Sequence, residues 1–166
     1  MRNKLGGGVI LIKVNIVAVG RVKEKYFSDG IDEYVKRLSR FAQVKITEIK
    51  EELLIKDGDA EIKNVIQKEG ERILPFLKGY VIALAVEGKK LSSEKLSEKL
   101  SSIKNSVGEV TFVIGGSYGL DKVVKDKADF LLSFSDMTFP HTLMRLILTE
   151  QLYRAFMIEA GASYHK

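Results

Sequence analysis

The chain has 166 residues, 45% of them hydrophobic and 30% charged, which suits one soluble domain with a proper core. It contains no cysteine and two histidines, which excludes a disulfide framework and a thiolate site and argues against a histidine-rich metal site. The net charge of +5, from 27 Lys and Arg against 22 Asp and Glu, permits an anionic partner such as RNA without requiring one.

The beginning of the chain combines one or two basic residues with a short apolar run. Lys13 interrupts that run, which continues as a strand and has no small-residue cleavage site, so it makes a poor signal peptide. No apolar run in the sequence reaches the length of a membrane span. We therefore expect a cytoplasmic protein.

Apolar, β-branched runs alternate along the chain with segments whose apolar residues recur at spacings of three and four. The runs predict buried strands and the segments predict helices. Strands are expected at 12–19, 44–50, 80–86, 110–114 and 129–134. Helices are expected at 23–40, at 59–77 with Asp59 as its cap, after Ser92 or Ser93, at 121–127 and from Pro140 to Gly161. This alternation predicts an α/β domain with a mostly parallel sheet and helices on both faces.

The last helix follows a polar, turn-prone segment at 133–138. Pro140 suits its first turn, Thr138 or Ser135 is expected to cap its free N–H groups, and Gly161 fits its C-terminal stop.

This helix carries two apolar stripes, whereas a surface helix usually has one. One stripe comprises Leu146, Tyr153 and Met157, and the other comprises Met144, Ile147, Leu148, Ala155 and Ile158. The polar seams between them are Arg145 with Thr149 and Glu150 with Arg154. Two stripes indicate two packing partners. One is the sheet of the same chain, and the other is either a second subunit or another part of the same domain.

Three loops follow the carboxyl ends of expected strands, where ligands bind in open α/β sheets: 84–88, 115–119 and 134–140. The glycines at 115, 116 and 119 would let a ligand approach the backbone, although the same spacing also suits a tight strand–helix turn. They match neither the dinucleotide motif nor a phosphate-binding P-loop, which disfavours a general nucleotide-binding protein. The polar segment 135–138 lies between apolar residues, so it suits either an adenosine moiety or a helix cap beside core residues.

Polar candidates for chemistry gather near the C-terminus: His141, Arg145, Arg154, Tyr164 and His165. Each also has an ordinary structural explanation as a helix-pair, first-turn or chain-end residue. No paired carboxylates, Ser-His-Asp triad or metal constellation can be assembled from the spacing.

Four segments together have a specific pattern. They are Val-Ile-Gly-Gly-Ser-Tyr-Gly at 113–119, Ser-Phe-Ser-Asp-Met-Thr-Phe-Pro-His at 133–141, Glu-Gln-Leu-Tyr-Arg-Ala at 150–155 and Tyr-His-Lys at 164–166. This combination closely resembles the ribosomal RNA large subunit methyltransferase H family, a minimal branch of the SPOUT methyltransferases. The resemblance covers residues 12–166 as a single domain and leaves residues 1–11 as an N-terminal extension.

The resemblance implies a C-terminal segment that passes through a loop to form a deep trefoil knot. It implies a homodimer whose knot loops bind S-adenosyl-L-methionine, with no metal and no membrane. The implied reaction is methylation of N3 of a pseudouridine, at position 1915 in the usual numbering of 23S ribosomal RNA, on assembled ribosomes. The alternative from another class is a non-catalytic ribosome-binding module that keeps the knotted fold.

The resemblance also carries site residues to this sequence. The cofactor contacts fall on Leu84, Gly115, Gly116, Phe134, Ser135, Asp136, Met137, Thr138 and Phe139. Arg154, Tyr164 and His165 match positions near the methyl group and the RNA, where His165 is the candidate general base and Arg154 a contact to phosphate or a substrate oxygen. Ala85 departs from the acidic residue that many members have after this leucine, which could alter how the cofactor's polar end is held.

Overall fold

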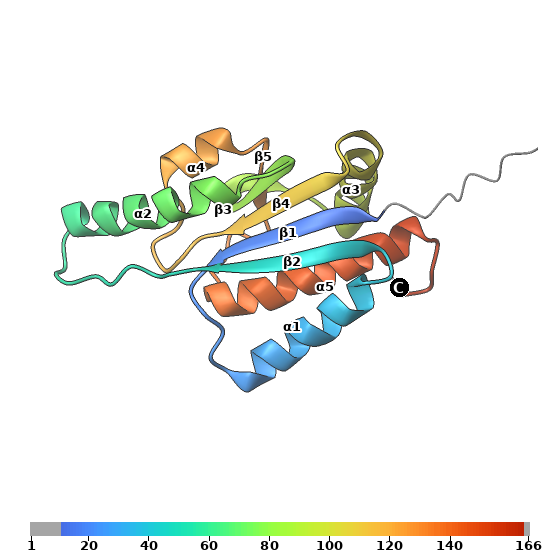
Figure 1. Cartoon of the computed structure of the whole chain (residues 1–166), viewed down its shortest axis with the longest axis horizontal. Coiled ribbons are helices and arrows are strands. Elements are labelled where there is room, and N and C mark those ends of the chain that lie inside the picture. Colours follow the sequence, from blue (N-terminus) through green and yellow to red (C-terminus); the bar gives the residue numbers. More distant parts are fainter. Residues whose placement is uncertain (1–10, 165–166) are drawn as a thin grey trace, which may run out of the picture.

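Five strands form one sheet at the centre of the computed structural model, which describes residues 11–164 (Figure 1). They are β1 (Ile12–Val19), β2 (Ala42–Ile49), β3 (Tyr80–Lys90), β4 (Glu109–Ile114) and β5 (Phe130–Ser133). The strand order is β2-β1-β4-β3-β5 and every pairing is parallel. All five carboxyl ends therefore lie at one edge of the sheet, as the α/β prediction requires.

Helices cover both faces of this sheet. They are α1 (Lys25–Leu38), α2 (Asp59–Ile73), the short 3-10 helix η1 (Leu74–Phe76), α3 (Ser93–Ser106), α4 (Lys122–Lys127) and α5 (His141–Glu159). In Figure 1, α1 and α5 lie below the sheet and α2 and α4 above it. No helix among the described residues is long and apolar enough to cross a membrane. The predicted α/β fold with helices on both faces is confirmed.

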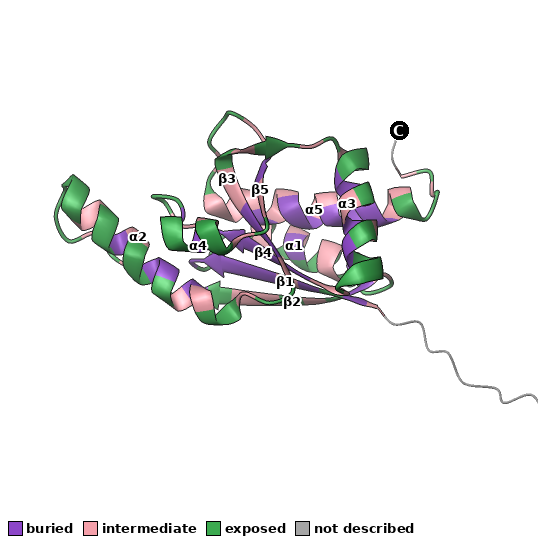
Figure 2. Ribbon diagram, turned by 90° about the horizontal axis from the view of Figure 1, so that it is seen from above, coloured by how far each residue is buried: buried purple, intermediate pink, exposed green. Residues whose placement is uncertain are grey.

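Alternating residues of β1 supply two separate cores. Val14, Ile16 and Ala18 pack with side chains of α1, α3 and α5, whereas Val17 and Val19 pack with side chains of α2 and α4. Successive strand residues point to opposite faces, so a strand in the middle of this three-layer structure is mostly apolar on both faces. Figure 2 shows the resulting concentration of buried residues on the strands and on α5.

Three predicted element ends were wrong. β3 continues to Lys90, beyond the expected residue 86, because after a register shift its last residues pair with β5. Gly58, and not Asp59, is the N-cap of α2, and Asp59 is the first helical residue. The helix ends at Ile73 because Pro75 lacks an N–H group, and the chain continues as the 3-10 turn η1.

The start of α5 also differs from the prediction, whereas its end agrees. Pro140 is the N-cap and no side chain caps this end. The Ser135 hydroxyl instead accepts a hydrogen bond from the Met137 amide at 3.0 Å, so it serves the preceding loop. At the other end, Gly161 has a φ of +68° and the following amide donates to the Met157 carbonyl at 3.0 Å. Glycine tolerates this left-handed conformation, which stops the helix as predicted.

The face of α5 that the sequence marked as a polar seam is buried. Arg145 is 3% exposed and Thr149 is fully buried, on the same side as Leu152 and Phe156. α5 lies between α1 and α3, which it contacts on its two sides. Tyr153 of the first stripe is 8% exposed and packs against Tyr34, Phe41 and Tyr164 of its own chain. For this stripe the alternative of a helix sandwiched within one domain is therefore correct.

Candidate functional site

A cavity of about 810 Å³ opens at the carboxyl ends of β4 and β5, beside the second half of β3. Its wall comes from residues 84–87, 114–120 and 132–141, so the structure brings together the three segments singled out in the sequence, although 84–87 lies within β3 and is not a loop. The wall is mostly apolar, with Leu84, Ile114, Leu132, Phe134, Phe139 and Met144. An apolar cavity with a few polar groups is typical of a small-molecule site.

The glycine loop at 115–119 closes on itself at this edge. Gly116 and Gly119 form an isolated bridge, with the Gly119 amide donating to the Gly116 carbonyl at 3.1 Å. A Cβ atom on Gly115 would lie 2.9 Å from the backbone carbonyl of Gly119. The first glycine is therefore required by the tight turn itself, and the turn presents backbone groups to the cavity.

Eight of the nine predicted cofactor residues line this cavity: Leu84, Gly115, Gly116, Phe134, Ser135, Met137, Thr138 and Phe139. Asp136 is outside the lining. Its side chain is 81% exposed and forms an ion pair with Lys90, at the end of β3. Asp136 is therefore the one predicted cofactor residue outside the cavity wall, and its contact with the cofactor stays a prediction.

The beginning of α5 is fixed to the ends of β1 and β2. The Arg145 guanidinium donates to Glu48 Oε2 at 2.8 Å and to the Gly20 carbonyl at 3.1 Å. The His141 ring lies against Gly20, where a Cβ atom would come within 2.9 Å of His141 Cε1. Gly20 has a φ of +87°, so glycine suits this position both in conformation and in space.

His141, one of the polar candidates named from the sequence, also lines the cavity, although it was not among the predicted cofactor contacts. Its Nδ1 atom is buried and has no hydrogen-bond partner within residues 11–164. Buried polar atoms usually have a partner, so this nitrogen is a polar group that a ligand could satisfy. In the sequence, His141 is the last residue of the motif at 133–141.

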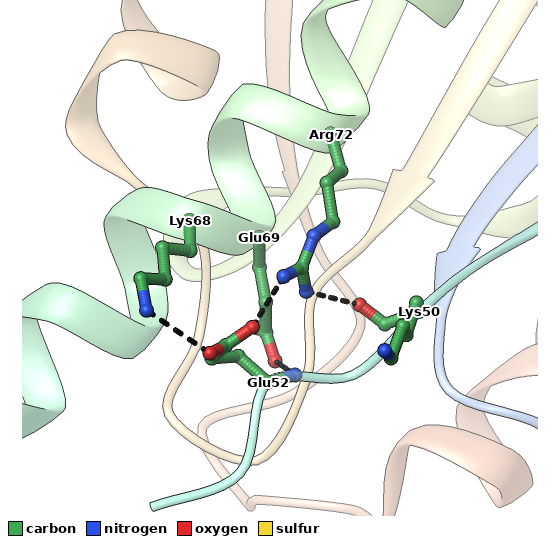
Figure 3. Close-up of polar contacts among 5 residues, drawn as sticks. All are labelled: Lys50, Glu52, Lys68, Glu69 and Arg72. Atoms are coloured by element: carbon green, nitrogen blue, oxygen red, sulfur yellow. Dashed lines mark hydrogen bonds and ion pairs between the residues drawn. The ribbon is translucent and has the colours of Figure 1, made fainter.

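A buried carboxylate supports the glycine loop from behind (Figure 3). Glu69 of α2 is 2% exposed, and its Oε1 accepts a hydrogen bond from the Glu52 amide at 3.0 Å. A Cβ atom on Gly116 would lie 2.9 Å from Glu69 Oε2. Around it, Arg72 donates to the Lys50 carbonyl at 2.9 Å and pairs with Glu52. The carboxylate thus occupies the space that a side chain at residue 116 would need.

We expect the Glu69→Gln variant to gain stability relative to the native chain as the pH rises. Burial raises the pKa of Glu69 above its ordinary value of 4.5, and the charges of Glu51 and Glu52 add to this shift, whereas the hydrogen bond from the Glu52 amide and the charge of Arg72 oppose it. The unfolded chain then loses this proton at lower pH than the folded chain, so ionisation destabilises the fold as the pH rises above about 4.5. Glutamine cannot ionise and escapes this loss.

The measurement is the free energy of unfolding by urea at several values between pH 4 and pH 7. The difference, variant minus native, should become more positive across this range. The exposed neighbour on the same helix provides a control, since Glu71→Gln should give a nearly constant difference. A constant difference for Glu69→Gln as well would contradict the assigned pKa direction.

Two charged side chains that the sequence did not single out also line the cavity. Lys125 of α4 donates to Glu87 Oε1 of β3 at 2.8 Å. This hydrogen bond lowers the pKa of Glu87, so the carboxyl is ionised at neutral pH. Glu87 lay within a selected loop, whereas nothing local marked Lys125.

Arg154 and Tyr164 meet each other, but away from the cavity of their own chain. Both bind Glu150 Oε1, Arg154 through Nε at 3.0 Å and Tyr164 through its hydroxyl at 3.2 Å. The Arg154 guanidinium lies 4.9 Å from the centre of the Tyr164 ring. α5 begins at the cavity and its 19 residues extend about 28 Å, so these residues belong to its far end. His165 lies outside the described residues.

The environment of Tyr164 determines its protonation. Burial, the hydrogen bond with Tyr34 and the charge of Glu150 raise the pKa of Tyr164 to about 12. At neutral pH this side chain is therefore a neutral phenol that donates hydrogen bonds, which favours His165 over Tyr164 as the candidate general base.

The matching family and two of the similar proteins are all described as methyltransferases. The family described as "Predicted SPOUT methyltransferase" matches residues 12–165. The relative named "Ribosomal RNA large subunit methyltransferase H" from Streptococcus uberis (strain ATCC BAA-854 / 0140J) is 50% identical over 159 residues, which is 93% of this chain and 100% of the relative. The protein of the same name from Streptococcus suis (strain 05ZYH33) is 45% identical with the same coverage.

Among solved structures, "a probable methylase family protein from Haemophilus influenzae Rd KW20" superposes with a TM-score of 0.50. The superposition spans 93% of this chain and 70% of the Haemophilus influenzae chain, at 13% sequence identity. At this identity the likeness supports the fold alone.

Proposed function

The chain belongs to the SPOUT methyltransferase family, within its ribosomal RNA large subunit methyltransferase H branch, and from this membership we propose that it methylates large-subunit ribosomal RNA with S-adenosyl-L-methionine. The observation that carries the proposal is the cavity at the carboxyl edge, which is lined by eight of the nine residues expected to hold the donor. We further propose that the target is N3 of the pseudouridine at position 1915 of 23S ribosomal RNA in the assembled ribosome.

The residues of the cavity suit this donor. Its size lies within the range of about 300–1,000 Å³ that is usual for small-molecule sites. Phe134 and Phe139 supply apolar surface for an adenine ring, and the loops around Gly115 and Leu84 supply backbone groups for its polar edge. Bound there, S-adenosyl-L-methionine would supply an electrophilic methyl group.

The protein's share of methyl transfer is alignment and removal of one proton. Alignment requires rigid loops, and two contacts restrain them: Arg145 binds the Gly20 carbonyl after β1, and Glu69 lies beneath Gly116. The N3 proton must leave the base, and His165 is our candidate general base because its unperturbed pKa lies near neutrality. Arg154 is proposed to contact a phosphate or a base oxygen.

Arg154 and Tyr164 lie at the opposite end of α5 from their own cavity, so we propose that they act on the cavity of a second copy in a homodimer. If the α5 helices of two chains pack antiparallel, each C-terminal tail reaches the partner's loop at 134–140. The half-buried face of α5 that contains Ile147 is the candidate contact surface. Ile147 and Gln151 border a second, smaller cavity of about 220 Å³ beside the first.

Ile147→Glu should convert the dimer to a folded monomer, because a charge at a dry interface loses its hydration without a partner. Light scattering coupled to size exclusion measures the mass, and circular dichroism measures the fold. Val123→Glu is the matched control: Val123 is 47% exposed on α4, on the other face of the sheet, so its dimer should persist. A native chain that is monomeric, or an Ile147→Glu chain that remains dimeric, would contradict this interface.

The catalytic proposal and the ribosome-binding alternative give different results in one experiment. Ribosomes from a strain lacking this methylation are incubated with the protein and methyl-labelled S-adenosyl-L-methionine, and the digested RNA is analysed by mass spectrometry. We expect label in N3-methylpseudouridine from the 23S RNA. Binding to ribosomes without any transfer would favour the non-catalytic module, and label at another nucleotide would overturn the proposed target. The cytoplasmic location and the knotted path remain predictions that accompany this function.

A further inference from the structure

We propose that the ion pair between Glu87 and Lys125 is a subsite for the zwitterionic amino-acid end of the methyl donor, in which Lys125 binds the carboxylate and Glu87 binds the ammonium group. This inference rests on the proposed function, because it assumes that S-adenosyl-L-methionine occupies the cavity. It assigns a role to two charged residues, Glu87 of β3 and Lys125 of α4, that were not among the predicted cofactor contacts.

The distribution of charge along the cavity wall supports this assignment. Among the acidic, lysine and arginine side chains of residues 11–164, those of Glu87 and Lys125 are the two that line the cavity. They come from β3 and α4, whereas the aromatic residues Phe134 and Phe139 come from the loop after β5. The cavity therefore combines apolar surface with one pair of opposite charges, and S-adenosyl-L-methionine likewise combines a nucleoside with a zwitterion.

Glu87 and Lys125 are exposed enough to leave each other and bind a ligand instead. The Lys125 side chain is 28% exposed and that of Glu87 is 57% exposed, so both remain in contact with solvent. An ion pair this exposed contributes little to stability, and opening it costs little. A ligand with a carboxylate and an ammonium group on the same carbon would give each residue a new partner of the right sign. Neither residue would be left unpaired, which avoids the larger penalty of burying a lone charge.

Two nearby residues, Ala85 and Asp136, offer no carboxylate to an ammonium group inside the cavity. Ala85, two residues earlier in β3, also lines the cavity but carries no charge. Asp136 is outside the lining of the cavity. The carboxylate available to a bound ammonium group on this wall is therefore that of Glu87.

The experiment compares two ligands that differ by the amino-acid part. S-Adenosyl-L-homocysteine retains the zwitterion, and 5′-methylthioadenosine has the same nucleoside and thioether without it. Their affinities are measured by calorimetry for the native chain and for Glu87→Gln and Lys125→Met. Lys122→Met serves as the matched control, because Lys122 lies on the same helix, pairs with Asp126 and is outside the cavity lining.

Each cavity variant should bind S-adenosyl-L-homocysteine about tenfold or more weakly, since each loses one hydrogen bond to a charged group. Affinity for 5′-methylthioadenosine should change by less than about twofold, which also shows that the variants are folded. Lys122→Met should match the native chain with both ligands. Equal losses for the two ligands, or no loss for S-adenosyl-L-homocysteine, would overturn the subsite. If the native chain bound neither ligand, the proposed donor itself would be wrong, which separates the two failures.

Discussion

Replacing Gly115 with valine should weaken the binding of S-adenosyl-L-methionine by about 100-fold while the sheet remains folded. A Cβ atom at this position would lie 2.9 Å from the Gly119 carbonyl and 3.0 Å from Leu120 Cγ, so the loop at 116–119 must move. Overpacking of this kind typically costs about 1–3 kcal/mol, and each 1.4 kcal/mol is a factor of ten in affinity. The damage stays local because the strand pairing of β4 ends at Ile114.

Calorimetry measures the affinity of this variant, and circular dichroism measures its fold. Gly108→Ala is the control, because Gly108 has a φ of +75° but a Cβ atom there meets nothing within 4 Å. Its stability should fall slightly from backbone strain, and its affinity should remain native. Native affinity in a folded Gly115→Val chain would place the methyl donor elsewhere.

Removal of residues 164–166 should reduce methyl transfer to ribosomes by about 100-fold or more while affinity for the methyl donor stays within about twofold. Proton transfer by a positioned side chain is worth about 100- to 10,000-fold, and the truncation removes the proposed base His165. The helix should survive, because Arg154 still holds Glu150 once Tyr164 is gone. Donor binding should survive because we propose that the tail faces the RNA base, and not the donor, at the partner's cavity, and Tyr164 is outside the lining of the cavity in its own chain.

Single-turnover methylation of ribosomes and calorimetry with the donor separate these two effects. Tyr164→Phe provides a finer variant, since it keeps the ring that packs on Tyr153 at 5.0 Å and removes the hydroxyl that binds Glu150. Equal losses of transfer and donor binding would mean that the tail is structural. A truncated chain with native activity would leave it without a role.

The strands were predictable because a strand buried on both faces is a run of consecutive apolar residues. β1 lies between two strands and two helical layers, so every position from 14 to 19 except Asn15 is apolar, and its predicted bounds were correct. Longer-range partners could not be read in this way. Arg145 looked like part of a polar seam because its partners, Glu48 and the Gly20 carbonyl, lie 97 and 125 residues earlier. A helical pattern shows that such a residue is polar but not that a distant carboxylate lets it be buried.

The same limit applies to the candidate site. The loops at 115–119 and 134–140 could be located because ligands bind beyond the carboxyl ends of parallel strands, whereas residues 84–88 belong to β3. The individual cofactor residues came from the motif similarity. The outward turn of Asp136 depends on Lys90, 46 residues earlier, and the charged pair on the wall joins Glu87 to a lysine 38 residues later. Nothing in the sequence marked Glu69, because it lies in a charged helix and only the folded chain places Gly116 against its carboxylate.

The order of the strands has a consequence for how the chain is made. β4 lies between β1 and β3, and Lys13 of β1 pairs with Glu109, so the middle of the sheet is synthesised long after its first strand. α5, which packs between α1 and α3, is later still. Protein synthesis adds about 5–20 residues per second, so α5 is made on the order of ten seconds after β1. Until then, the apolar face of β1 on the α5 side lacks this helix. A nascent chain arrested before α5 should therefore bind holding chaperones and remain protease-sensitive, because it lacks the last layer of its core.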